Sequence, residues 1–478
     1  DEQSIIINAW EHAILNEKVK TSPLREFKAI FRSSSPLMIT FLLQYSYSAA
    51  SIFSVGHIGK IELGAVTLGS MTANITAISI IHGLATCLDT LCSQAYGANR
   101  YHLVGAYCQR CVALLFTIIA PIILFWFIGA EYILNLLIND SQLSKLAAAY
   151  LKVISIGIPG YVLFEAGKRF LQSQGIFHAS TYILIVCAPL NAIMNYLFVW
   201  NSHIGIGYLG APLAVAINYW LMPIGLLIYT LTNKNLINPL KCWNGLHIKQ
   251  SFKGWNRMFK LALSGLIMVF AEFFAFEVLT LGSSHLGITA LATNSVIASV
   301  ASLSYQIPFA VSIALSTRLA NFIGASLPYS SQICAKVGVV FGTSMGITNG
   351  LVIYCFRHKI ARAFTSDEDV ISELIRVFPI VSSIQIFDAL NAVSAGVLRG
   401  EGLQHIGSIV NLAAYYIIGL PLAFVLAFKF NFQLEGLWMG IGIALLLIGV
   451  VQCYYGIVVP DWNNLIKTAS DRTEAERS

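Results

Sequence analysis

Two carboxylates, Glu272 and Glu277, stand inside one strongly apolar stretch of the sequence, residues 258–284. An acidic side chain is costly to hold in a bilayer unless it faces a cavity or a partner, so such residues are candidates for function. On a helix, five positions place the two side chains about 140° apart. We therefore expect one carboxylate to line a cavity and the other to point into the bundle, unless a local kink turns both inward.

A second apolar stretch carries a ladder of three polar residues, Gln385, Asp388 and Asn391. Their spacing of three places them close to one face of a helix. A carboxyl group removed from water favours its neutral form, and a second acid nearby strengthens that preference, so it can bind and release a proton near neutral pH. We predict that Glu272, Glu277 and Asp388 form a site for protons and cationic substrate, supported by Gln385 and Asn391.

Further polar residues are expected beside this site. Tyr305, Gln306 and Asn294 belong to the apolar stretch 288–323, which follows the stretch that carries Glu272. Gln44 stands 228 residues before Glu272, at an equivalent place in the first half of the chain. The acid thus occurs in only one half. A purely structural hydrogen-bond network is the alternative interpretation of the same residues, and the sequence leaves it open.

The first half contains its own charged group, Glu165, Lys168 and Arg169. Spacings of three and four allow an internal ion pair on a helix, which would offset most of the cost of burying these charges. We favour a structural role over transport for this group. Asp89 lies at the end of another apolar stretch, where it can cap a helix or pair with a basic side chain.

Composition sets the class of protein in which these residues must work. The chain has 478 residues, of which 56% are hydrophobic and 11% charged, whereas an ordinary soluble domain has about 25% charged residues. Disorder is excluded because disordered chains are poor in aromatic residues, and this chain has 28 Phe, 20 Tyr and 8 Trp. The mean hydropathy of +0.72 indicates a membrane protein.

Twelve apolar stretches are long enough to span a bilayer, which requires about 20 residues each as a helix. They are residues 35–58, 65–93, 108–137, 148–173, 179–200, 205–232, 258–284, 288–323, 334–356, 372–398, 405–430 and 435–459. The predicted fold class is therefore an all-α polytopic membrane protein. Several of these stretches contain proline, which a helical bundle tolerates as a kink.

An internal repeat organises the twelve helices. Residues 89–98 (DTLCSQAYGA) precede 316–325 (STRLANFIGA) by 227 positions, and 171–175 (LQSQG) precede 398–402 (LRGEG) by the same offset. Two six-helix lobes of the same orientation are therefore predicted, related by an axis along the membrane normal. The predicted division is an N-terminal segment (1–34), an N-lobe (35–232), a linker (233–257), a C-lobe (258–459) and a C-terminal tail (460–478).

Orientation follows from the basic residues, because cytosolic loops carry an excess of Lys and Arg. Under twelve spans, 21 of the 29 Lys and Arg residues fall on the side of the two termini and the linker, and eight fall on the other side. Both termini and the linker are therefore expected in the cytosol. The net charge of +6 is explained by this topology, and we expect no nucleic-acid partner.

Motifs for other classes of protein are missing from the sequence. It contains no H-E-x-x-H metal motif and no phosphate-binding G-x-x-x-x-G-K-[ST] loop, and the pair Cys108 and Cys111 has no second pair or histidine beside it. We expect no metal, no cofactor and no enzyme activity, so that transport would be driven by an ion gradient. The alternatives are a lipid or lipid-linked sugar flippase, which would favour a basic cavity, and a passive channel or sensor.

Residues 88–97 (LDTLCSQAYG), 316–324 (STRLANFIG) and 396–400 (GVLRG) resemble the multidrug and toxic compound extrusion (MATE) transporters, most closely their eukaryotic, fungal-type branch. The resemblance covers nearly the whole chain. It implies a twelve-helix, two-lobe antiporter that exchanges protons, or sodium in some bacterial members, for organic cations and other amphiphilic solutes.

The family's acids match Glu272, Glu277 and Asp388 in this sequence. Two positions depart from the family pattern, because Ser299 stands where some relatives have a glutamate, and Gln44 and its neighbours stand where some bacterial relatives have an aspartate. We expect a monomer that exports drugs, metabolites or other organic cations by alternating access, in the plasma membrane or the vacuolar membrane.

Overall fold

The computed structural model describes residues 14, 17, 20–55, 58–138, 140–233 and 238–477, and within these ranges the regular structure is helical throughout. The chain forms two compact units. We call residues 39–92 and 100–262 the N-unit, and residues 1–38, 93–99 and 263–478 the C-unit. The all-α fold class is confirmed.

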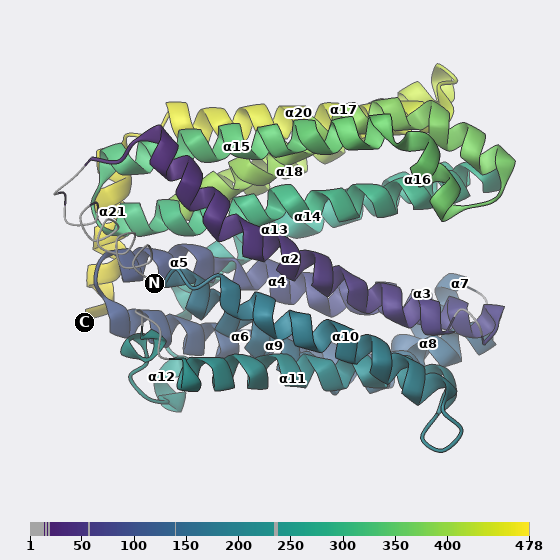
Figure 1. The fold of residues 1–478 in the computed structure, drawn as a ribbon, viewed down its shortest axis with the longest axis horizontal. Coiled ribbons are helices and arrows are strands. Elements are labelled where there is room, and N and C mark those ends of the chain that lie inside the picture. The colour runs from purple at the N-terminus through teal and green to yellow at the C-terminus, as the bar shows by residue number, and fades with distance from the viewer. Residues whose placement is uncertain are drawn as a thin grey trace. The chain divides into compact units, whose positions relative to one another are not determined.

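The N-unit takes most of its helices from the first half of the chain (Figure 1). They are the later part of α2 (Pro23–Val55), α3 (Lys60–Ala73), the π-helix η1 (Asn74–Ile78), α4 (Ser79–Ala85), the start of α5 (Cys87–Gly97), α6 (Tyr101–Ile128), α7 (Ala130–Ile138), α8 (Ser141–Ile154), α9 (Ile158–Ser173), α10 (His178–Trp200), η2 (Gly207–Leu209), α11 (Gly210–Thr232), η3 (Pro239–Cys242), α12 (Ile248–Ser251) and the start of α13 (Trp255–Ser284).

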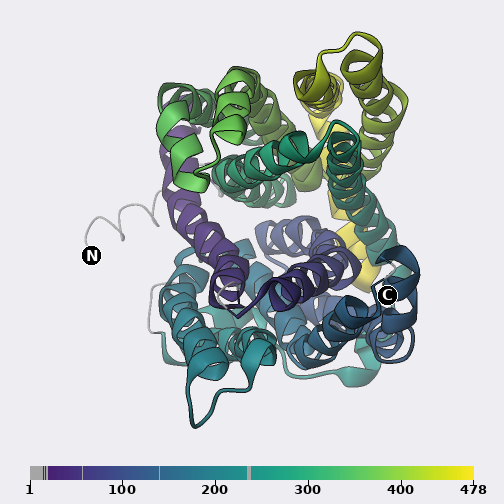
Figure 2. The same ribbon diagram turned by 90° about the vertical axis from the view of Figure 1, so that its right-hand side faces the viewer.

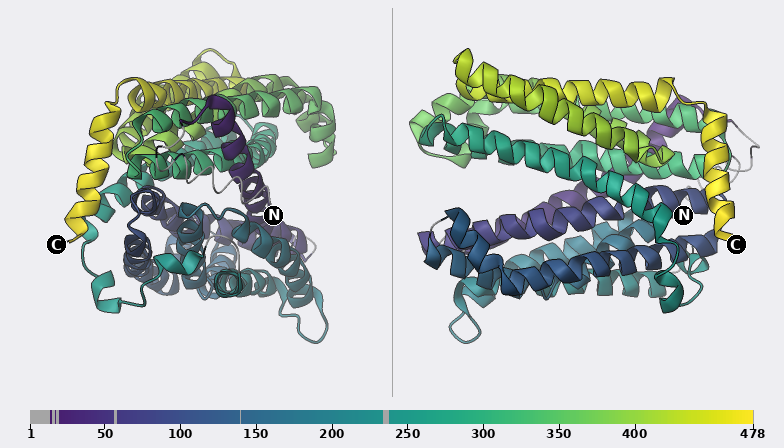
Figure 3. Two further views of the ribbon diagram at one scale, coloured as in Figure 1. Left: turned by 60° about the vertical axis from the view of Figure 1, so that its left-hand side comes forward. Right: turned by 180° about the vertical axis from the view of Figure 1, so that it is seen from behind.

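The C-unit holds the remaining helices, seen along their length in Figure 1 and closer to end-on in Figure 2. They are the first part of α2, the end of α5, the rest of α13, then α14 (Ile288–Gly324), α15 (Pro328–Cys355), α16 (Arg357–Phe364), α17 (Glu368–Glu401), α18 (Gln404–Leu412), the π-helix η4 (Ala413–Gly419), α19 (Leu420–Phe424), η5 (Val425–Lys429), α20 (Gln433–Cys453), η6 (Tyr454–Val458), α21 (Trp462–Glu474) and η7 (Ala475–Arg477). The amphipathic helix α21 lies across the ends of α14 and α15 (Figure 3).

The predicted membrane spans have counterparts in the described helices. Eleven of these are long and apolar enough to cross a membrane, and a bent pair, Ser141–Ile154 with Ile158–Ser173, completes a twelfth. The pair bends by 51° at a short break, beside Pro159, whose ring prevents a regular helical hydrogen bond. Its bounds differ from the predicted stretch 148–173 because α8 starts seven residues earlier, at an Asp140 cap.

Helix α2 also begins earlier than the sequence indicates, at Pro23 rather than near residue 35. Its first turn carries Glu26, which is fully buried. The Glu26 carboxylate accepts hydrogen bonds from Thr21 Oγ1, at 2.5 Å, and from Arg318 Nε and Nη2 of α14, at 2.5 and 3.0 Å. A hydropathy pattern assigns these polar residues to water, whereas in the structure they are paired with one another.

The Glu26–Arg318 pair leads to a double-mutant prediction. Because Glu26 is buried, Arg318→Ala leaves an uncompensated charge, and we expect the free energy of unfolding to fall by about 3–5 kcal/mol. The double variant Glu26→Ala/Arg318→Ala removes both charges and should recover part of that loss. Thermal unfolding of the purified protein in detergent measures both. Additive effects of the two substitutions would contradict the pairing.

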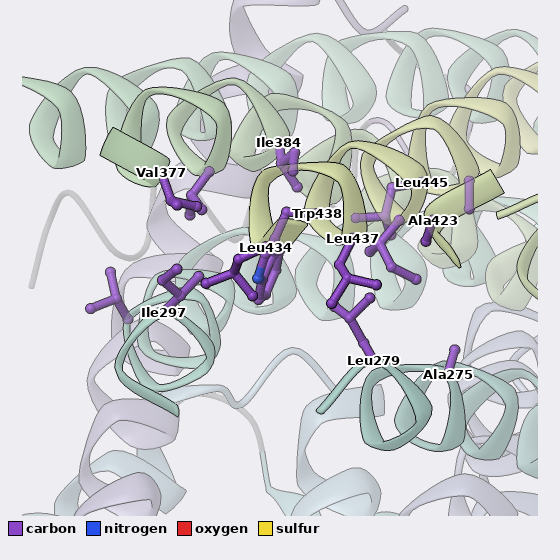
Figure 4. Close-up of a cluster of buried hydrophobic side chains, with 14 of the residues drawn as sticks. Ala275, Leu279, Ile297, Val377, Ile384, Ala423, Leu434, Leu437, Trp438 and Leu445 are labelled. Carbon is purple, nitrogen blue, oxygen red and sulfur yellow. The ribbon is translucent and has the colours of Figure 1, made fainter. Parts of the chain in front are cut away.

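Helix α17 forms the centre of the C-unit and packs along α14, α15 and α20. Its apolar residues Val377 and Ile384 meet a cluster from α13, α14 and α20, and Figure 4 shows Leu437 of α20 directed toward Leu279 of α13. This packing places residues of α13 and α17 in one hydrophobic cluster. These two helices carry the acids that the sequence singles out.

A close crossing of α5 and α14 within the C-unit follows the predicted repeat. A Cβ atom at Gly97 would overlap the backbone carbonyl of Asn321, and one at Gly324 would overlap the carbonyl of Gln94. The two contacts are related by the same offset, 227 residues, from 94 to 321 and from 97 to 324. Glycine is therefore required at both places because the two backbones touch.

Candidate functional site

Two of the predicted acids lie close together in the C-unit. Glu272 of α13 is half-buried, and Asp388 of α17 has only 7% of its surface exposed. The two carboxyl groups are near enough for their charges to interact. Asp388 Oδ1 is buried and has no hydrogen-bond partner among the described residues, so this oxygen is free to bind a proton or a cation.

Glu277, the third predicted acid, is separate from this pair. It lies on the same helix as Glu272 but on another face, and its side chain is exposed. No hydrogen bond or ion pair joins Glu277 to another described residue. The helical spacing anticipates that the two acids diverge. The exposed position of Glu277 differs from the expectation that the second acid points into the bundle.

Two tyrosines complete the surroundings of the Glu272–Asp388 pair. Tyr305 of α14 and Tyr415 of η4 both lie within electrostatic reach of the two carboxyl groups. Tyr415 is fully buried, and its hydroxyl has no hydrogen-bond partner among the described residues. The sequence pattern predicts a role for Tyr305 but not for Tyr415, although a Tyr-Tyr pair inside an apolar stretch is a detectable signal.

Arg399 is a cation that the sequence analysis did not place in the site. It follows Asp388 by eleven positions on α17, which brings the two residues to within about 20° of one helical face. Arg399 is buried, its charge acts on Glu272, and its Nη2 donates a hydrogen bond to the Ser312 hydroxyl. Residues 396–400 contain this arginine, but the sequence motif does not reveal that its charge acts on Glu272.

The other predicted polar residues have separate roles. Gln385 and Asn391 are buried beside Asp388 on α17. Asn294 is held in a structural network, because its Nδ2 donates to Thr280 Oγ1 at 3.2 Å and its Oδ1 accepts from Trp438 Nε1 at 3.0 Å.

Two glutamines that were expected beside the site, Gln306 and Gln44, have defined positions in the structure. Gln306 donates to the carbonyl oxygen of Ser302, one turn back on its own helix. Gln44 is half-buried in the N-unit.

A chain of hydrogen bonds fixes α13 relative to α17. Ser394 Oγ donates to Gln452 Oε1 at 2.8 Å, Gln452 Nε2 donates to Asn411 Oδ1 at 3.4 Å, and Asn411 Nδ2 donates to the carbonyl oxygen of Met268 at 3.2 Å. All three side chains are buried. Met268 precedes Glu272 by one helical turn, so this chain positions the carboxylate without contacting it.

Breaking this series of hydrogen bonds should impair transport because Glu272 is then positioned less well. With Asn411→Ala, Gln452 loses a partner and α13 loses its lateral anchor, so we expect the maximal transport rate to fall by about three- to tenfold, since one buried hydrogen bond contributes about 1 kcal/mol. The KM for substrate should change less than the rate. Initial-rate uptake into proteoliposomes measures both, with Asn349→Ala on α15 as a control. Equal losses in the two variants would contradict a positioning role.

The N-unit contains the predicted ion-pair group in an extended form. Glu165 accepts from Lys168 Nζ at 3.0 Å and pairs with Arg169 Nη1, while Arg169 Nε lies 3.3 Å from Asp89 Oδ1. His82 Nδ1 is 3.9 Å from Glu165 Oε2. The two acids and two bases are all buried. Because the group holds as many acids as bases, their charges cancel. The predicted ion pair is confirmed, and Asp89 is a buried member of it.

Glu401 is a further buried acid that the sequence analysis did not weigh. It ends α17 and is 4% exposed, and neither carboxylate oxygen has a hydrogen-bond partner among the described residues. Its equivalent in the first half is Gln174, at the same 227-residue offset. An ionised carboxylate buried in this way is costly, so Glu401 is a competitor of the Glu272–Asp388 pair for binding a proton.

Comparison with known proteins decides the family. The MatE family model matches residues 36–197 and 266–425, one segment in each half of the chain. The chain belongs to the MatE family. The two matched segments also correspond to the two halves of the internal repeat.

Named relatives extend this similarity over almost the full chain. An uncharacterised transporter of Saccharomyces cerevisiae is 44% identical over 451 residues, which is 94% of this chain and 64% of the relative. Multidrug and toxin extrusion protein 1 of Homo sapiens is 31% identical, covering 93% of this chain and 76% of the human protein. The chain thus spans just under two thirds of the yeast relative's length.

A solved structure of the family has the same fold. The crystal structure of the eukaryotic MATE transporter AtDTX14 superposes with a TM-score of 0.87 at 28% identity, covering 94% of this chain and 99% of that one. Together with the apolar helices, this similarity shows an integral, multi-pass membrane transporter of the MatE family. The yeast relative and AtDTX14 are both named as transporters.

Proposed function

We propose that this MatE transporter is a proton-coupled antiporter that exports organic cations, drugs or metabolites from the cytosol. The observation that carries the proposal is the Glu272–Asp388 pair, two interacting carboxyl groups on separate helices of one apolar unit. No cofactor is needed, since a proton gradient supplies the energy. Its substrate is a small cationic or amphiphilic molecule.

The mechanism follows from competition for one negative site. When the pair is deprotonated it attracts a cation, and when it is protonated that attraction is lost, so a proton and a substrate displace each other. Alternation of the two units between open states then exchanges one for the other across the membrane. Arg399 limits the net negative charge of the site, because its guanidinium acts on Glu272. Tyr305 and Tyr415 provide hydroxyl groups near both acids.

We place this exchange in the plasma membrane or the vacuolar membrane, with both termini in the cytosol and the chain acting as a monomer. The excess of basic residues on one side supports this orientation. Both membranes hold a proton gradient directed into the cytosol, which suits export.

A lipid or lipid-linked sugar flippase is the alternative that the fold allows. Such a protein would need basic groups free to receive phosphate. In the N-unit, Lys168 and Arg169 are paired with Glu165 and Asp89. In the C-unit, the charge of Arg399 acts on Glu272. These pairings favour cationic cargo.

The test is proton flux in proteoliposomes with an imposed pH gradient, read with a pH-sensitive dye while a series of organic cations is added. Antiport predicts proton movement that depends on the cation and saturates with its concentration. The same vesicles with fluorescent phospholipids measure lipid translocation. Lipid movement without cation-dependent proton flux would replace the antiporter with the flippase.

A further inference from the structure

Residues 238–254, which contain η3 and α12, pack against helix α6 of the N-unit. Gln109 of α6 donates from Nε2 to the carbonyl oxygen of Gly245 at 2.9 Å, and its Oε1 accepts from the backbone N–H of His247 at 2.9 Å. A Cβ atom at Gly105 would approach the carbonyl oxygen of Cys242 to 2.5 Å. Residues 238–254 therefore form an ordered platform along α6.

The platform and the adjoining start of α13 together carry concentrated positive charge. Lys249, Lys253, Arg257 and Lys260 are all exposed, and none of the four forms an ion pair with another described residue. The sequence contains no Asp or Glu between residues 166 and 271. These four cations therefore have no acidic neighbour along the chain, unlike the buried cations Lys168, Arg169 and Arg399.

Large apolar side chains of the platform are also exposed, just before and among these cations in the sequence. Leu246 is 68% exposed, Ile248 63% and Phe252 56%. Exposing such large apolar side chains to water is unfavourable. A segment that combines apolar side chains with Lys or Arg is stable at a membrane interface. There the apolar groups enter the acyl region and the cations meet lipid phosphates.

A cavity adjoins the platform where α13 begins. It has a volume of about 530 Å³ and is lined by Leu114, Ile118, Trp255, Asn256, Phe259 and Lys260. Its walls are mainly apolar, and Lys260 and Asn256 provide polar groups. This combination fits an acyl chain together with the polar head to which the chain is attached.

We propose that the platform and this cavity bind an anionic phospholipid, with its phosphate at Lys260, Lys253 and Lys249 and an acyl chain along Leu114 and Phe259. The proposal goes beyond the antiport function, and the ligand differs from a transported cation, which these lysines would repel. Charge complementarity supports the assignment, because anionic lipids attract basic segments next to membrane helices.

The experiment measures lipid retention by the purified transporter in native mass spectrometry after exchange into mixed micelles containing equal amounts of phosphatidylserine and phosphatidylcholine. We expect the parent protein to retain phosphatidylserine preferentially. Lys249→Gln/Lys253→Gln/Lys260→Gln should reduce that preference by at least about tenfold, since each basic residue contributes to the attraction. The matched control is Lys145→Gln/Lys152→Gln/Lys429→Gln, which removes three exposed lysines elsewhere and should keep the preference.

Three results would overturn the proposal. They are equal retention of both lipids by the parent protein, equal losses in both triple variants, and displacement of the lipid by millimolar inorganic phosphate, which would assign the cations to free phosphate. If the triple variant does not fold, Lys260→Gln alone should still lower the preference measurably. Proton flux in vesicles of phosphatidylcholine alone keeps this test separate from the antiport function, because lipid binding can fail while cation exchange persists.

Discussion

Glu272→Gln is expected to reduce cation-dependent proton flux in proteoliposomes by more than about tenfold, equivalent to about 1.4 kcal/mol of lost coupling. The amide keeps the size of the side chain but can neither hold the exchanged proton nor attract a cation as a carboxylate does. Asp388→Asn should produce a loss of the same order, because the two carboxyl groups interact. The double variant should be no worse than the more severe single one.

Two other acids provide the comparison for this result. Glu277→Gln changes an exposed carboxylate on the same helix, so we expect proton flux coupled to cation movement to persist, with a higher KM for the cation. Glu401→Gln replaces the buried acid at the end of α17 and should retain coupled flux if the Glu272–Asp388 pair carries the proton. Coupling that survives Glu272→Gln and Asp388→Asn but is lost in Glu401→Gln would move the proton site to Glu401.

Arg169→Met should cause the largest loss of stability among single substitutions of the N-unit. Arg169 bridges Glu165 and Asp89, and all three side chains are buried. Removing it leaves two buried carboxylates with one lysine and one histidine, so we expect the free energy of unfolding to fall by about 3–5 kcal/mol. Thermal unfolding in detergent, with folded yield from size-exclusion chromatography, measures the effect.

Substitutions of neighbouring residues distinguish pairing from packing. Arg169→Lys keeps the charge but loses the planar fork that reaches two carboxylates, so it should recover only part of the stability. Lys168→Met removes a base that forms an ion pair with Glu165 and with no second acid among the described residues, so it should be less harmful than Arg169→Met. An unfolding temperature unchanged by Arg169→Met would show that the group is not the structural centre of the N-unit.

Much of the membrane architecture could be predicted because hydropathy depends on local sequence. The stretch 288–323 corresponds to α14 at Ile288–Gly324, and 179–200 corresponds to α10 at His178–Trp200. Helix starts were less predictable where polar residues are paired at a distance. Glu26 reads as a surface residue until Arg318, 292 positions later, is brought beside it.

In the candidate site, too, the features that depend on local sequence could be predicted. The sequence by itself determined that Glu272 and Asp388 are costly acids in apolar helices, that Gln385 and Asn391 share the face of Asp388, and that Glu272 and Glu277 diverge on their helix, because these features follow from residue type and helical period. Which of the two acids faces the site was decided by the structure, where Glu277 is exposed. The repeat also follows from sequence alone, and its paired glycines at 97 and 324 meet the carbonyls that the offset relates.

Only the tertiary structure decided which groups act together. Tyr415, Arg399 and the Asn411–Gln452 chain come from different helices, and no spacing along one helix reveals that they surround or position Glu272. The same holds for Glu401, whose burial depends on what packs over the end of α17. The physical reason is that charge interactions and hydrogen bonds act through space over a few ångströms, whereas hydropathy and helical period act along the chain.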